Sequence, residues 1–241
     1  MQTIKSFFLY SLVFLMLSPT IQAQKSKVLI FSKTMGFRHK SIEHGREVIT
    51  DMCLSNDIAV DSTENAALFT TKNLKQYDAL IFLNTTGDLF NDKEQKAFIK
   101  YIQDGGGFVG IHAATDAEYD WDWYGKMAGG YFKSHPKQQK AKVKIINKNH
   151  ASTNMLPDEI VRRDEWYDFK NVNPDIIVLA TLDETSYKGG KMNNDHPIVW
   201  YHEFEGGRVF YTGFGHTDET FDEPLMQKHM LGGIKYAIGK K

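Results

Sequence analysis

Three histidines of the chain follow predicted strands, at positions where a side chain can enter a ligand site. His39 follows the first predicted strand, His112 ends a short apolar strand in mid-chain, and His216 follows the last predicted strand. An imidazole binds metals and moves protons near neutral pH. Because the carboxyl ends of parallel strands meet at one edge of a sheet, we expect these histidines to share one site.

The residues around His112 have the pattern of a sharp strand-to-helix turn. Gly110 lies two positions before it and Ala114 two positions after it, and small residues at these places allow the turn. Hydrolases with this turn place a Ser at its centre, and related amidotransferases place a Cys there. The sequence therefore predicts a site without a covalent nucleophile. Asp116, one helical turn later, is predicted to orient or charge His112 as the catalytic base, either directly or through the backbone of the turn.

Other side chains are candidates for the same site. Glu165 is the alternative base, in which case His112 is an electrophile or a ligand. Aromatic side chains can stack on the faces of sugars, although they pack protein cores at least as often. The predicted substrate-binding residues are Arg38, Trp121, His135, Trp166 and His196.

The three strand-end histidines allow two interpretations of their chemistry. His39, His112 and His216 could bind a divalent metal through three neutral nitrogens and leave a position open for substrate. They could equally form a metal-free cluster joined by hydrogen bonds. The sequence requires no cofactor and leaves both interpretations open.

Composition limits the partners of the chain. Charged residues make up 24 % of the chain, and their positive and negative charges nearly cancel, which leaves a net charge of −1. The composition therefore does not favour binding to nucleic acid or to an anionic membrane. Cys53 is the only cysteine, which excludes an internal disulfide. The expected partner is a small carbohydrate, and no feature indicates an oligomeric state.

The first 23 residues are predicted to be a secretory signal peptide. Lys5 precedes the apolar run 7–17, Pro19 breaks that run, and Ala23 offers a small residue at the cleavage point. We therefore expect an exported, periplasmic protein with no stable membrane span after cleavage. The mature chain is expected to be one domain, residues 24–241.

Apolar runs that alternate with helical patterns predict an α/β fold with a mostly parallel sheet. Asn91, followed by Glu94, is expected to begin a helix through a capping box. Gly206-Gly207 predicts a β-hairpin near the carboxyl end. The expected strands are 27–32, 58–62, 79–84, 108–112, 141–146, 176–182, 198–204 and 208–212, and the expected helices are 41–54, 91–104 and one that starts at Pro224.

These motifs together resemble the ThuA-like family, named for trehalose utilisation. The resemblance extends from Lys27 almost to the end of the chain. It implies a three-layer, flavodoxin-like fold of the class I glutamine amidotransferase type. It also implies a role in the catabolism of trehalose and related disaccharides, alongside oxidoreductases that make 3-keto sugars. The matching segments are Gly36–His39, Gly110–Asp116, Gly129–His135, Asp164–Tyr167, His196–Trp200 and Gly213–His216.

The sequence is compatible with three functions. The first is an enzyme that removes the acidic proton beside the carbonyl of an oxidised glycoside, which needs a base and an electrophile but no nucleophile. The second is a sugar-binding module without catalysis. The third is retaining glycoside hydrolysis, for which Asp116 and Glu165 are the only carboxylate pair that we nominate. Glutaminase activity is not expected, because Cys53 lies in the first predicted helix.

Overall fold

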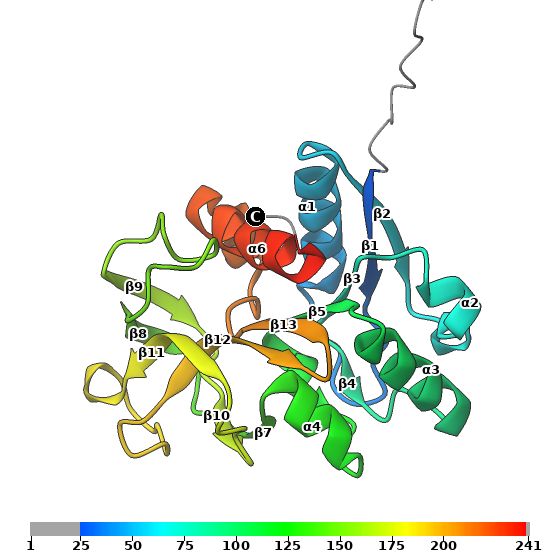
Figure 1. Ribbon diagram of the computed structural model, residues 1–241. Coiled ribbons are helices and arrows are strands. Elements are labelled where there is room, and N and C mark those ends of the chain that lie inside the picture. The colour runs from blue at the N-terminus through cyan, green and yellow to red at the C-terminus, as the bar shows by residue number, and fades with distance from the viewer. Residues whose placement is uncertain (1–24, 240–241) are drawn as a thin grey trace, which may run out of the picture.

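A nine-stranded mixed sheet forms the centre of the computed structural model, which describes residues 25–239 (Figure 1). Its strand order is β2-β1-β3-β5-β13-β12-β11-β8-β9. The strands are β1 (Ser26–Phe31), β2 (Ile58–Thr63), β3 (Ala79–Leu83), β5 (Gly107–Ile111), β8 (Gln139–Ile145), β9 (Glu159–Asp164), β11 (Ile177–Asp183), β12 (Pro197–Phe204) and β13 (Gly207–Thr212).

The sheet has a parallel half and an antiparallel half. Strands β2, β1, β3, β5 and β13 run parallel, as the sequence predicts. Strands β12, β11, β8 and β9 extend the sheet with antiparallel pairings. The last strand in the sequence, β13, therefore lies between the two halves and pairs with β5 on one side and β12 on the other.

Helices cover both faces of the parallel half and complete the three-layer arrangement. In Figure 1, α1 and α6 lie together on one side of the sheet, and α3 and α4 lie on the other. Apolar strands buried on both sides explain why β1, β3 and β5 are nearly continuous apolar runs. The helices are α1 (Ile42–Leu54), α2 (Thr71–Leu74), α3 (Asp92–Gln103), α4 (Asp122–Ala128), α5 (Asp218–Asp222) and α6 (Pro224–Ile238).

Short elements join these layers. They are the strands β4 (Thr86–Gly87), β6 (Asp116–Ala117), β7 (Tyr131–Ser134) and β10 (Asp168–Lys170), and the 3₁₀ turns Ala66–Leu68, His112–Thr115 and Glu184–Ser186. Strands β7 and β10 pair with each other outside the main sheet. This pairing places the residues just before β10 next to those just after β7.

Several local predictions are confirmed. Asn91 and Glu94 form the capping box of α3. The predicted β12–β13 hairpin is present, but its turn is Glu205-Gly206, both with positive φ, one residue earlier than the predicted Gly206-Gly207 pair. Pro224 opens α6, and Cys53 is buried on α1.

Ser41 has a different role from the helix cap that the sequence suggests. It precedes α1, but its hydroxyl makes no capping hydrogen bond. The hydroxyl instead donates to the carbonyl oxygen of Gly215, 3.0 Å away, and accepts from the Asn84 amide. A residue that appears suited to start a helix is thus used to fix the loop after β13.

The turn at His112 is sharp but does not lead into an α-helix. His112 has a φ of +47°, in the left-handed region that few residues other than glycine adopt. A single 3₁₀ turn, His112–Thr115, follows before the chain becomes extended again at β6. Asp116 therefore does not lie one α-helical turn beyond His112, which the prediction of its role assumed.

No helix within residues 25–239 is long and apolar enough to cross a membrane. The predicted signal peptide, residues 1–23, lies outside the described residues.

Candidate functional site

Four side chains meet at the carboxyl ends of the central strands. His39 follows β1, His112 follows β5, His216 follows β13, and Glu165 directly follows β9. One nitrogen or oxygen atom from each lies within 4.8 Å of the corresponding atoms of the other three. The structure thus brings together the three predicted histidines and adds a carboxylate from the antiparallel half of the sheet.

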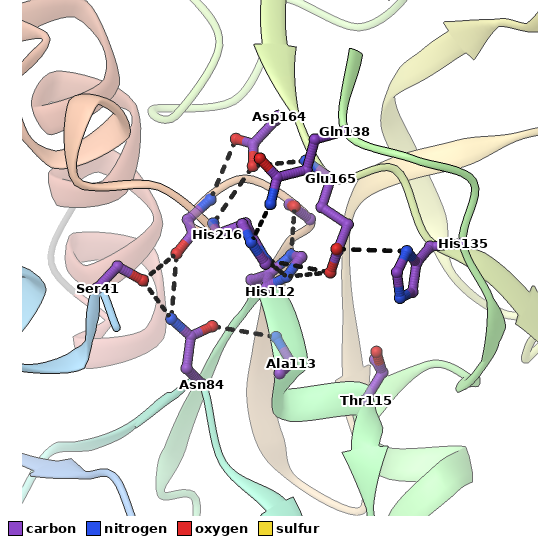
Figure 2. A network of polar contacts seen from close by, with 12 residues as sticks. Ser41, Asn84, His112, Ala113, Thr115, His135, Gln138, Asp164, Glu165 and His216 are labelled. Atoms are coloured by element: carbon purple, nitrogen blue, oxygen red, sulfur yellow. Dashed lines mark hydrogen bonds and ion pairs between the residues drawn. The ribbon is translucent and has the colours of Figure 1, made fainter. Parts of the chain in front are cut away.

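The contacts inside this cluster are short. Nε2 of His112 lies 3.2 Å from Nδ1 of His216. The Oε2 atom of Glu165 lies 3.1 Å from Nδ1 of His216 and 3.6 Å from Nε2 of His112. Figure 2 shows these three side chains pointing toward one another. The ring of His39 lies edge-on to both other imidazoles, with centroid separations of 5.0 Å.

The backbone fixes the tautomer of His112. Its Nδ1 lies 3.0 Å from the carbonyl oxygen of Gly213. A carbonyl oxygen only accepts hydrogen bonds, so Nδ1 carries the proton and donates it. In the neutral ring, Nε2 therefore presents a lone pair to Glu165 and His216.

His216 is held from its outer side by Gln138. The Gln138 amide contacts Nε2 of His216 at 2.5 Å. The nitrogen and oxygen of a glutamine amide exchange places on a half-turn, so the amide can either donate to Nε2 or accept from it. Gln138 thereby allows His216 Nδ1 to carry a proton or a lone pair.

His39 is buried and neutral. It is 2 % exposed, and Nδ1 has no hydrogen-bond partner among the described residues. Burial, reinforced by the neighbouring His112 and His216, lowers the pKa of His39 to about 2. An orphaned nitrogen of this kind costs about 1–3 kcal/mol when it stays unpaired.

Glu165 is a carboxylate that also contacts His135. Burial acts to raise the pKa of Glu165, but the adjacent His112 and His216 outweigh it and hold the pKa well below its ordinary value. The Oε1 atom of Glu165 lies 3.3 Å from Nδ1 of His135. That Nδ1 also donates to the carbonyl oxygen of Pro136, so Nε2 of the half-exposed His135 keeps its lone pair.

Asp164 supports the cluster through hydrogen bonds to the backbone of two of its members. Its side chain is fully buried and accepts hydrogen bonds from the backbone N–H groups of Glu165 and His216 at 2.9 and 3.3 Å. It also accepts from the Thr220 hydroxyl, and Arg162 lies 3.7 Å away. One carboxylate thus ties two members of the cluster to each other.

Asn84 supports the opposite side. Its amide nitrogen donates to the carbonyl oxygen of Gly215 at 3.1 Å, and its amide oxygen accepts from the N–H group of Ala113 at 3.3 Å. Asn84 thus connects the loops that carry His112 and His216, as Figure 2 shows.

Asp116 does not orient His112 by direct contact. Among the described residues, the hydrogen bonds and ion pairs of His112 side-chain nitrogens go to Gly213, His216 and Glu165. The Asp116 carboxylate instead accepts from the Tyr119 hydroxyl at 2.6 Å, because the 3₁₀ turn changes its direction. Burial raises the pKa of Asp116.

Four predicted substrate-binding residues lie in other surroundings. Arg38 forms ion pairs with Glu43 and Glu64. Trp121 packs in the aromatic group under α3, stacked on Trp123. Trp166 is fully buried, and its indole N–H donates to a backbone carbonyl oxygen. His196 is also fully buried.

The contacts of His196 belong to a second polar group, with Asp168 and Glu184. Its Nε2 donates to the carbonyl oxygen of Tyr167 at 2.8 Å, and its Nδ1 lies 3.0 Å from Glu184. The ring of Tyr167 in turn packs on His112. His196 therefore holds the segment that carries Glu165 rather than reaching a ligand.

Sequence reasoning did not single out Gln138, Asn84 or the supporting role of Asp164. The Asp-Glu pair at 164–165 contained a usable signal. Successive residues at a strand end point to opposite sides of the strand. Glu165 therefore faces the histidines, and Asp164 faces the backbone and Thr220 on the other side. Gln138 and Asn84 carry no comparable signal, since polar residues at strand ends and in loops are common.

The comparison with known families agrees with this arrangement. The sequence model described as "ThuA: Trehalose utilisation" matches residues 27–237. The chain belongs to the ThuA family. No match was found among the curated proteins.

Solved structures share the fold of this ThuA-family chain. A ThuA-like protein from Bacteroides uniformis is 25 % identical with a TM-score of 0.75, over 91 % of this chain and 94 % of the other. A ThuA-like protein from Parabacteroides merdae is 20 % identical, also with a TM-score of 0.75, over 90 % and 91 %. A β-galactosidase from Bacillus circulans matches with 10 % identity and a TM-score of 0.59, over 90 % of this chain but 32 % of the enzyme. The last match concerns the fold alone.

Proposed function

We propose that this ThuA-family chain is an enzyme of glycoside catabolism that acts on a disaccharide or glycoside carrying a ring ketone. The observation that carries the proposal is the convergence of His39, His112, His216 and Glu165 at the ends of the central strands. Binding a neutral sugar needs no such concentration of imidazoles. A reaction that moves a proton and develops negative charge does need it.

The chemistry of a 3-keto-glycoside fits these groups. The proton on C2 is acidic because it lies beside the C3 ketone. When a base removes it, the C–H electrons form an enolate, and the C3 oxygen becomes negatively charged. The enolate can then expel the C1 oxygen, which takes up a proton as the C1–O bond breaks and a C1–C2 double bond forms. No covalent nucleophile is required.

His135 is our candidate for the base. Its Nδ1 proton is directed at the carbonyl oxygen of Pro136 and at Glu165, and its Nε2 lone pair is free. Its side chain is 40 % exposed, whereas that of His112 is fully buried. His112 would then have the electrophile or ligand role considered from the sequence, in which its Nε2 carries a proton or binds a cation that stabilises the enolate oxygen.

Deuterium exchange on a keto sugar tests the proposal. Wild-type protein incubated with 3-keto-trehalose in D₂O is expected to exchange the C2 proton and to release a monosaccharide, monitored together by NMR. Unoxidised trehalose serves as the matched control and is expected to remain intact. Cleavage of trehalose itself would instead support hydrolysis by two carboxylates.

The binding-module alternative predicts a different result. In that case the protein would bind the keto sugar or trehalose saturably, with neither exchange nor product above the protein-free rate. This outcome would contradict the proposed enzymatic function. No second function is favoured by a specific contact in the site.

We also propose that the protein is exported, on the support of the charged, apolar and small-residue pattern of residues 1–23. Amino-terminal sequencing of protein from its native host is expected to begin near Gln24. An intact Met1 on protein from the cytoplasmic fraction would contradict export.

A further inference from the structure

The cluster contains more lone pairs than protons to share among them. His112 presents an Nε2 lone pair, because its Nδ1 proton goes to Gly213. The Oε2 atom of Glu165 lies 3.6 Å from that lone pair, while the other oxygen, Oε1, faces Nδ1 of His135. The Nδ1 proton of His216 is the one that can lie between Nε2 of His112 and Oε2 of Glu165, and Nδ1 of the buried His39 has no hydrogen-bond partner within residues 25–239. Something positively charged would satisfy all four groups at once.

The separations between these atoms are within about 0.2 Å of the ligand–ligand distances in a tetrahedral metal site. Zinc binds imidazole nitrogen and carboxylate oxygen at about 2.0–2.2 Å, so two tetrahedrally placed ligand atoms lie about 3.3–3.6 Å apart. The three separations among His112 Nε2, His216 Nδ1 and Glu165 Oε2 are 3.2, 3.1 and 3.6 Å. The fourth group, His39, has its ligand atom within 4.8 Å of the others.

The surroundings of the cluster are those of metal-ligating histidines. Such histidines usually donate their second N–H to a carbonyl or carboxylate, which fixes the ring. His112 does so to Gly213, and the Gln138 amide can accept the same bond from Nε2 of His216. Three imidazoles and one carboxylate favour Zn²⁺ or a similar transition metal over Mg²⁺ or Ca²⁺, which prefer oxygen ligands.

We infer that His39, His112, His216 and Glu165 form a binding site for one divalent transition metal, with a further coordination position open to substrate. The sequence allowed either a metal site or a metal-free cluster of hydrogen-bonded histidines. The inference here is the metal site, with Glu165 as a fourth ligand. A metal here would polarise the ketone oxygen as a Lewis acid. Only that last step rests on the proposed function.

The second polar group, Asp168, Glu184 and His196, provides an internal comparison. Its three members also lie within 4.8 Å of one another. Both oxygens of each carboxylate, however, already accept from protein donors: Glu184 from the N–H groups of Met192 and Asn194, and Asp168 from the Lys191 N–H group and the Ser134 hydroxyl. A group satisfied by its own chain needs no ion.

Metal binding is tested without any substrate. Tag-free full-length protein is stripped with a chelator and titrated with Zn²⁺ by calorimetry, and the bound metal is then measured by mass spectrometry. We expect one equivalent of tightly bound Zn²⁺. The Co²⁺-loaded protein is expected to show the visible d–d bands of a four- or five-coordinate nitrogen and oxygen site.

Variants locate the bound ion. Glu165→Gln and His39→Phe are expected to weaken Zn²⁺ binding by more than about 100-fold, the upper end of the effect of losing an outer-shell partner. The exposed-surface variants Asp158→Asn and His44→Ala are expected to bind like wild type. Gln138→Leu removes the partner of His216 Nε2 and is expected to weaken Zn²⁺ binding by about 10–100-fold. Because Gln138 lies in a loop and is not itself a ligand, this variant tests the site even where the ligand variants fold poorly.

Two results would overturn the inference: less than stoichiometric Zn²⁺ on folded wild-type protein, or unchanged affinity in both Gln138→Leu and a folded ligand variant. These failures are distinct from failure of the proposed function. Metal bound by a protein that leaves 3-keto-trehalose untouched would contradict the enzymatic proposal alone. Turnover by metal-free protein would contradict only the role of the metal in polarising the ketone.

Discussion

Replacing His112 by Asn is expected to lower keto-glycoside turnover by about 10²–10³-fold, the usual cost of removing one group that stabilises a developing oxyanion. The amide nitrogen of Asn can take the place of Nδ1 and keep the hydrogen bond to Gly213. Asn also adopts the left-handed backbone that His112 requires at φ +47°. The substitution therefore removes Nε2 and little else.

The measurements are C2-proton exchange and product release on 3-keto-trehalose, with thermal unfolding to verify the fold. His44→Asn is the control, because this histidine lies on α1 and its side-chain partner is Asp222. Full turnover by folded His112→Asn would show that Nε2 has no part in the reaction. Equal losses in both variants would indicate a general loss of structure.

The second large effect is expected on stability, from Asp164→Asn. Every neighbour of this buried carboxylate is a donor: the N–H groups of Glu165, Gly215 and His216, the Thr220 hydroxyl and the Arg162 guanidinium. An Asn amide has the same shape, but in either orientation it turns its NH₂ group toward some of them. It also removes the negative charge beside the buried Arg162, which keeps its ion pair with Glu223 and its hydrogen bond to Thr220.

Removing one partner of a buried ion pair typically costs about 3–5 kcal/mol, and we expect a loss of this size in the free energy of unfolding. Chemical denaturation of the wild type and Asp164→Asn measures it. Asp158→Asn is the control, because this carboxylate pairs with Lys148 in solvent and should change stability little. A loss no greater than that of Asp158→Asn would contradict the role assigned to Asp164.

The strand-end histidines could be found from the sequence because topology alone brings them together. Parallel strands end at one edge, so a histidine after β1, one after β5 and one after β13 must lie near one another. Glu165 was nominated as a site carboxylate from its Asp-Glu-Trp-Tyr context. Glu165 reaches the histidines because β9, in the antiparallel half of the sheet, ends near the edge where the parallel strands end. No local sequence pattern predicts this arrangement.

The substrate-binding residues were harder, because residue type does not reveal exposure. Trp166 looks suited to stack on a sugar but fills the core, where its indole N–H finds a carbonyl partner. His196 looks like a loop ligand but holds the Tyr167 carbonyl group. Asp116 was placed by assuming α-helical geometry after His112, and one 3₁₀ turn is enough to redirect its side chain.

The central position of β13 has a consequence for how the protein is made. β13 is the last strand to leave the ribosome, yet it fills the gap between β5 and β12. Until it is synthesised, both of these neighbours keep an unpaired edge, the kind of surface on which incomplete chains associate. His216 lies in the loop just after β13, so the four-residue cluster is completed only with the segment that closes the sheet. A chain stopped before this strand would have neither.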